Sequence, residues 1–203
     1  MERRETLKAI SLVLGYSVTP AVLTSILTSC NNEANVNWQP KFFSKEEAFG
    51  LEQLSNLILP KTDTPGALDV NAHIFADLFL ADVVNEKEQL KIKKGVKIWL
   101  KSFEDKTGNK VQDASVDDFK SDLSTYFDID EQKQKGIKKL LKEKSSDDDS
   151  FFIYSFLFKV KELIMFGYFA SEDIGENVLT YLPVPGKFDG CIPVEEVGRA
   201  WSL

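Results

Sequence analysis

The sequence predicts an all-α fold: a compact helical bundle followed by an extended C-terminal segment rich in proline and glycine. From residue 43 to residue 170, hydrophobic residues recur mostly at steps of three and four, which is the spacing of one helix face. Beyond Ser171, glycine and proline are so frequent that no long helix fits. The 203 residues, of which 43% are hydrophobic and 15 are Phe, are enough for one domain with one core.

The composition excludes several classes of function. A net charge of −7 makes nucleic acid an unsuitable partner. One His and two Cys exclude a four-cysteine zinc site, a thiolate-held iron–sulfur cluster and an attached c-type haem. The chain also lacks the Gly-x-Gly-x-x-Gly fingerprint of dinucleotide binding and a phosphate loop. We therefore expect no catalytic residues, no metal and no cofactor in this chain.

The first 29 residues predict an export signal. A basic pair precedes an apolar stretch that runs from Ala9 to Leu27. The pair and its neighbours resemble a twin-arginine motif, although Thr6 stands where that motif favours a large apolar residue. A general secretory signal is the alternative. The matching residues are Arg3, Arg4, Leu7 and Lys8.

The apolar stretch ends in small residues directly before a cysteine. Leu27-Thr28-Ser29-Cys30 resembles a bacterial lipobox, in which cleavage leaves the cysteine as an N-terminus with two or three acyl chains, enough for stable anchoring. An uncleaved transmembrane helix is the alternative, but Pro20 and several hydroxyl residues oppose it. We predict a leader over residues 1–29, lipidation at Cys30, a tether over residues 30–42 and an extracytoplasmic location on a membrane.

Six helices are predicted after the tether. The first runs from about Lys45 to Leu59, with Ser44 and Glu47 as a capping box and Pro60 after its end. Residues 61–66 form a structured loop, because Pro-Gly favours a turn. The next helices are expected over residues 71–83, 86–108, 115–127, 131–144 and 151–170.

The last of these helices is the most apolar part of the domain. Lys159, Lys161 and Glu162 lie in its middle, so it is a poor membrane span and a good central core helix. We interpret its aromatic residues as core packing rather than as a cofactor site. We interpret the acidic residues before it, within 145–150, as charge that favours a helix N-terminus rather than as a metal-binding loop.

Histidine and cysteine each occur once in the predicted domain. His73 begins an apolar helix and has no evident partner for general-base catalysis, so we interpret it as a packed or capping residue. Cys191 has no partner within the chain if Cys30 is lipidated. We expect a semi-buried, inert thiol at Cys191, with a disulfide to another chain as the alternative.

Three segments together resemble the gluconate 2-dehydrogenase subunit 3 family. The first is Leu57 to Ala67, and the second is Phe166 to Glu172 with Gly175. The third is Tyr181 to Gly186, which leads to residues 190–193. The order and spacing of these segments span about residues 43–193, whereas residues 91–144 hold no matching motif.

The resemblance implies a small accessory subunit without a cofactor. Members of that family accompany a flavin-dependent sugar or polyol dehydrogenase of the glucose–methanol–choline type, which holds FAD, often with a multihaem cytochrome c as electron acceptor. The large subunit commonly lacks a signal and is exported bound to the small one, which suits a twin-arginine route for folded cargo. The alternative function is a stand-alone lipoprotein that binds a small ligand or a surface partner.

The 61–67 loop and the extended segment over 181–193 are the predicted partner-binding surfaces. Proline and tight turns fix the backbone and reduce the entropy lost on binding. The alternative is that both segments only close the bundle. The candidate residues are Thr62, Asp63, Pro65, Gly66, Tyr168, Glu172, Tyr181, Pro185, Gly186 and Cys191.

Overall fold

The computed structural model describes residues 34, 36–142, 148–184, 186–187 and 190–202. These residues belong to one compact unit that begins at Ala34. The predicted export signal, with Arg3, Arg4, Leu7 and Lys8, lies outside the described residues, and so does the predicted lipidation site Cys30. No helix in the described ranges is long and apolar enough to cross a membrane.

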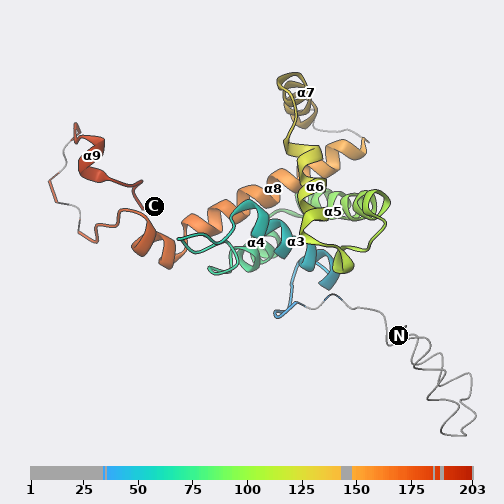
Figure 1. Ribbon diagram of the computed structural model, residues 1–203, viewed down its shortest axis with the longest axis horizontal. Helices are drawn as coiled ribbons and strands as arrows, with labels where there is room; N and C mark the ends of the chain where they lie inside the picture. The colour runs from blue at the N-terminus through green and yellow to red at the C-terminus, as the bar shows by residue number, and fades with distance from the viewer. Residues whose placement is uncertain (1–33, 35, 143–147, 185, 188–189, 203) are drawn as a thin grey trace, which may run out of the picture. The chain divides into compact units, whose positions relative to one another are not determined.

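The described residues form an all-α bundle, as predicted (Figure 1). Its long helices are α3 (Lys45–Ile58), α4 (Ala72–Asp82), α5 (Glu86–Thr107), α6 (Val116–Phe127), α7 (Glu131–Lys142) and α8 (Asp149–Phe169). Three short elements complete it: a 3-10 turn η1 (Val111–Asp113), a π-helical turn η2 (Ile174–Val178) and α9 (Val194–Val197). Each long helix lies within a few residues of its predicted position.

Local capping explains why the helix boundaries were predictable. The Ser44 hydroxyl accepts a bond from the Glu47 backbone N–H, and the Glu47 carboxylate accepts one from the Ser44 N–H. Gly108 ends α5 in the left-handed conformation, with a φ of 71°, which favours glycine. The Asp148 side chain accepts a bond from the Ser150 N–H. The acidic residues at the start of α8 therefore act as helix-terminal groups, and α8 begins at Asp149 rather than 151.

The central core helix is α8, which packs against both α4 and α5. The α5 and α8 backbones approach so closely that a Cβ on Gly95 would lie 2.3 Å from the Phe152 carbonyl oxygen. Next to this contact, the rings of Trp99 and Phe156 pack with centroids 5.5 Å apart. The aromatic residues on the inner faces of α8 therefore serve core packing, as predicted.

The segment before α3 is part of the folded unit, so the predicted tether over residues 30–42 is too long. The fully buried carboxylate of Asp77 on α4 accepts hydrogen bonds from the backbone N–H groups of Lys41 (2.6 Å), Phe42 (3.1 Å) and Phe43 (2.9 Å). The Trp38 indole N–H donates to Glu52 on α3 at 2.7 Å. These long-range contacts attach residues from Trp38 onward to the bundle, and Val36 packs against its core.

The C-terminal arm, residues 180–202, is irregular as predicted but turns back on itself. The Thr180 N–H donates to the Ala200 carbonyl at 2.8 Å, and the Ser202 N–H donates to the Thr180 carbonyl at 3.0 Å. The result is an isolated parallel bridge between Thr180 and Trp201. The arm is therefore a loop closed at its base, and its ends return to the neighbourhood of η2.

Replacement of Asp77 tests the attachment of the N-terminal segment. Asp77→Ala leaves three backbone N–H groups without their acceptor, so we expect a loss of about 3 kcal/mol or more in unfolding free energy. Asp82→Ala is the matched control, because its ion pair with Lys41 is half-exposed and is worth less than about 1 kcal/mol. Urea unfolding followed by circular dichroism measures both. Equal losses for the two variants would contradict the special role of Asp77.

Candidate functional site

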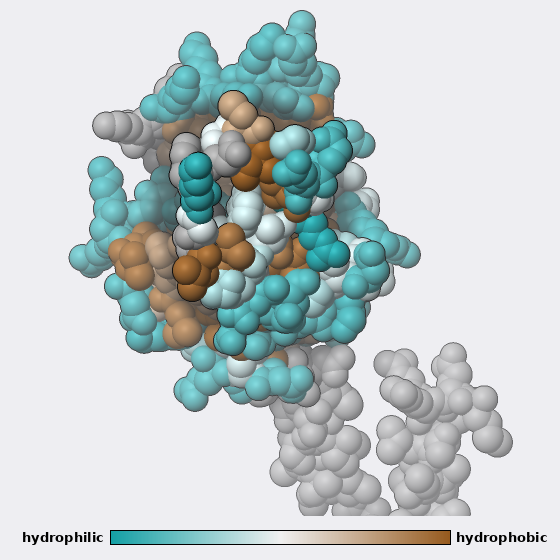
Figure 2. All heavy atoms as spheres, turned by 90° about the vertical axis from the view of Figure 1, so that its left-hand side faces the viewer, coloured by the Kyte–Doolittle hydropathy of each residue, from teal (hydrophilic) through white to brown (hydrophobic). Residues whose placement is uncertain are grey.

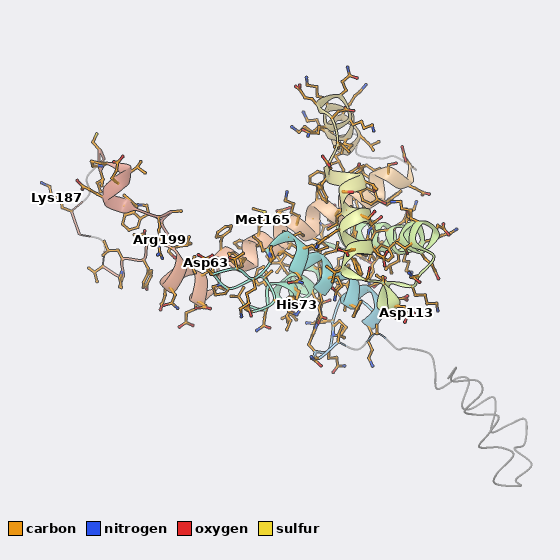
Figure 3. The ribbon with its side chains drawn as sticks, in the orientation of Figure 1. Asp63, His73, Asp113, Met165, Lys187 and Arg199 are labelled. Atoms are coloured by element: carbon orange, nitrogen blue, oxygen red, sulfur yellow. The ribbon has the colours of Figure 1, made fainter. Side chains whose placement is uncertain are left out.

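Three segments that are distant in the sequence surround one hollow of about 520 Å³. The loop after α3 contributes Asp63, Thr64 and Pro65. The η2 region and the C-terminal arm contribute Asp173, Asn177, Val178 and Arg199. Figure 3 labels Asp63 and Arg199, which come from the loop and the arm at this end of the molecule. The sequence predicted Asp63 and Pro65 as site residues but missed Asp173, Asn177 and Arg199, which carry no local motif.

The loop over residues 61–66 is held by its own backbone. The Thr62 N–H donates to the Thr64 carbonyl at 3.0 Å, and the Ala67 N–H donates to the Leu59 carbonyl at 2.8 Å. Gly66 lies so close to the chain before it that a Cβ would be 2.6 Å from the Lys61 nitrogen. Glycine is therefore required at position 66, and its role is to permit this close turn.

Asp69 fixes the loop from the other side, a role that no local sequence motif indicates. Its carboxylate accepts the Gly66 N–H at 2.8 Å and forms an ion pair with the Lys61 ammonium at 3.0 Å. The Gly66 bond and the Lys61 charge hold the pKa of the Asp69 carboxyl below its usual value. The carboxylate therefore stays ionised around neutral pH and keeps both ends of the turn together.

Tyr168 links the loop to the last turns of α8. Its hydroxyl donates to the Pro65 carbonyl at 2.8 Å, and its side chain is buried. Tyr168 therefore supports the loop from inside and offers no surface to a partner, unlike its expected role. The other candidates in this part of the chain, Thr62, Asp63 and Glu172, are exposed.

The arm closes the hollow through Arg199, whose guanidinium donates to the Val178 carbonyl at 3.1 Å. Tyr181, Gly186 and Cys191 are exposed, so the expectation of a semi-buried thiol at Cys191 is wrong. Pro185 lies outside the described residues. The arm exposes several large apolar side chains, namely Tyr181, Leu182, Val184, Ile192, Val194 and Trp201.

The hollow presents hydrogen-bonding groups and charge. Asp63 and Asp173 supply carboxylates, Asn177 an amide and Arg199 a guanidinium. Thr64 adds a hydroxyl, which lies 3.2 Å from the Thr62 hydroxyl. Among the described residues, no group of three or more His, Cys, Asp or Glu side chains is arranged to hold a metal ion. The arrangement suits polar recognition of a partner surface.

His73 does not line this hollow and is a packed residue, as interpreted from the sequence. It is buried on α4, where the Trp38 ring meets it edge-on with centroids 5.6 Å apart. Its Nε2 atom lies 3.8 Å from the Glu52 carboxylate. Burial lowers the pKa of His73 to about 4, so its imidazole is neutral at physiological pH.

The depressed pKa of His73 predicts a loss of stability in weak acid. Between pH 6.5 and about 4 the unfolded chain binds a proton at His73 that the folded chain does not, so the unfolding free energy falls as the pH falls. The expected loss reaches about 3 kcal/mol near pH 4. Urea unfolding at several pH values measures it, with His73→Leu as the comparison. If the unfolding free energy of His73→Leu fell as steeply with pH as that of the wild type, the loss could not be attributed to His73.

Comparison with known proteins identifies a family for most of the chain. The family model described as gluconate 2-dehydrogenase subunit 3 matches residues 45–186. The match begins with α3 and includes the loop after it, α8 and η2. No curated protein matches the chain, and no solved structure matches it.

Proposed function

The chain belongs to the gluconate 2-dehydrogenase subunit 3 family, and we propose that it is the non-catalytic accessory subunit of an extracytoplasmic, membrane-attached dehydrogenase. The family is named for one subunit of a dehydrogenase complex, so a dehydrogenase is the implied partner. In our proposal that partner is a glucose–methanol–choline-type flavoprotein that holds FAD and oxidises a sugar or polyol. A cytochrome c then accepts its electrons.

The observation that best supports this role is that the loop of the first family segment and the η2 region, which follows the second, meet around one hollow that Arg199 of the arm closes. The loop there is fixed by backbone hydrogen bonds and by Tyr168, so little ordering entropy is lost when a partner covers it. The adjoining arm exposes apolar side chains for which the bundle provides no burial. Exposed apolar surface of this kind is typical of protein–protein contact sites.

The N-terminal segment suits an escort that also anchors its cargo. We propose that the twin-arginine-like leader exports the flavoprotein already folded and bound, and that Cys30 then carries the lipid. The folded unit begins at Ala34, so only residues 31–33 separate it from Cys30. Such a tether spans at most about 14 Å and keeps the dehydrogenase beside the membrane surface.

Purification from the native membrane in mild detergent tests the accessory role. We expect a flavoprotein at about equal stoichiometry, recognised by the absorbance bands of flavin and by identification of the chains. The accessory subunit by itself is expected to oxidise no sugar or polyol. A colourless, solitary protein would overturn the proposal and favour a stand-alone lipoprotein that binds a small ligand or a surface partner.

The export route is tested separately by replacing both Arg3 and Arg4 with Lys. If the leader uses the twin-arginine route, the variant and its flavoprotein remain in the cytoplasm, which cell fractionation and flavin fluorescence measure. Cys30→Ser is the matched control, because it removes the lipid site and leaves the arginine pair intact. Unchanged export of the arginine variant would remove the twin-arginine part of the proposal and leave the subunit role standing.

A further inference from the structure

An apolar face lies on the outside of α4 and the second half of α8. We define it by Leu78 on α4 and by Met165, Phe166 and Phe169 on α8, whose exposed fractions lie between 37% and 47%. The α8 members follow one another at helical spacing, so they share one stripe of the helix. Figure 3 shows Met165 on α8, and Figure 2 shows hydrophobic side chains exposed among hydrophilic ones at the end that carries the arm.

The apolar face is rigid. The Phe166 ring packs edge-on against Phe75 and Phe79 of α4, with centroids 5.5 Å and 6.2 Å apart. A Cβ on Gly167 would lie 2.6 Å from the Phe75 ring, so the two helices are in close contact beneath the face. Because α4 and α8 are already held together, binding on this face requires little further ordering of side chains.

Acidic residues border the apolar face on α8 and just after it, and the half-buried Lys159 and Lys161 lie beside Glu162 on α8. Glu162 lies one turn before Met165 and Phe166 and is exposed, although it pairs with Lys159 at 3.2 Å. Glu172 and Asp173 follow Phe169 and are exposed as well. Asp173 also lines the hollow described above, so the apolar face and the hollow share a border.

We propose that the dehydrogenase subunit docks on the apolar face, through an apolar patch of its own that is bordered by lysine and arginine. This inference rests on the proposed function, which supplies the partner. The acidic border favours a partner whose own border is basic, because opposite charges around an apolar centre set the orientation of a protein complex. A stable interface buries about 800 Å² on each partner, more than four side chains supply, so it continues over the adjoining hollow.

The acidic border argues against a second copy of this chain on the same face. A twofold contact would pair the same face of the two molecules, so both sides of the interface would carry Glu162, Glu172 and Asp173 at their edge. Like charges at the edge of an interface oppose association. The same acidic border repels the anionic headgroups of a membrane. A flavoprotein with a basic border would be attracted to this face rather than repelled by it.

Photo-crosslinking in the intact cell tests the proposal without altering the packing. A photoreactive amino acid replaces Met165 in the full chain, and Val116 on α6, which is exposed to a similar extent, is the matched control. We expect a crosslink from position 165 to the flavoprotein and none from position 116. A crosslink from position 165 to a second copy, or to the arm of the same chain, would overturn the proposal.

A double substitution, Leu78→Glu with Met165→Glu, tests the energetic role of the apolar face. Neither residue belongs to the ring packing of Phe75, Phe79 and Phe166, so we expect an unchanged thermal unfolding midpoint. The amount of co-purified flavin is expected to fall by about tenfold or more, whereas Val116→Glu leaves it unchanged. Glu172→Lys is a second variant outside the apolar core of the face, and it is expected to weaken the complex by reversing a border charge.

The outcomes separate this inference from the proposed function. Wild-type protein that brings down no flavoprotein overturns both. If the wild-type protein co-purifies with a flavoprotein, and the folded double variant and Glu172→Lys recover the same amount of it, the docking face is overturned. The accessory role then stands.

Discussion

The close packing of α8 against α5 and α4 is the constraint on which the rest of the structure depends. Glycine permits it at two points, Gly95 facing Phe152 and Gly167 facing Phe75. With the helix backbones this close, the large aromatic side chains fill the core on either side of the contacts. The position of α8 then decides where its last turns, the loop after α3 and the η2 turn meet.

The candidate site is rigid because that packing holds the elements around it. Tyr168, near the end of α8, donates to the Pro65 carbonyl and so transmits the position of the helix to a loop more than a hundred residues earlier in the chain. Asp69 and Gly66 shape the same loop locally. A rigid polar loop beside exposed apolar side chains is suited to binding another protein surface, because the bound shape exists before the partner arrives.

Polar side chains in the interior and apolar side chains on the surface have different roles in this chain. Buried polar side chains serve the fold: Asp77 holds the segment before α3, and His73 stays neutral beside Trp38. Most of the exposed large apolar side chains lie on the α4 and α8 face and on the arm. In our proposal a dehydrogenase subunit covers them and supplies the burial that the described chain does not provide.

The sequence by itself determined the helices and the family, because capping boxes, proline stops and the short segments around Pro65 and Gly175 act within a few residues. Tertiary structure alone decided the roles of Asp77, Arg199 and Tyr168, because their partners lie between about 20 and 100 residues away along the chain. It also decided the exposure of Cys191 and the earlier start of the folded unit. Burial depends on which distant segments pack together, and no local pattern encodes that.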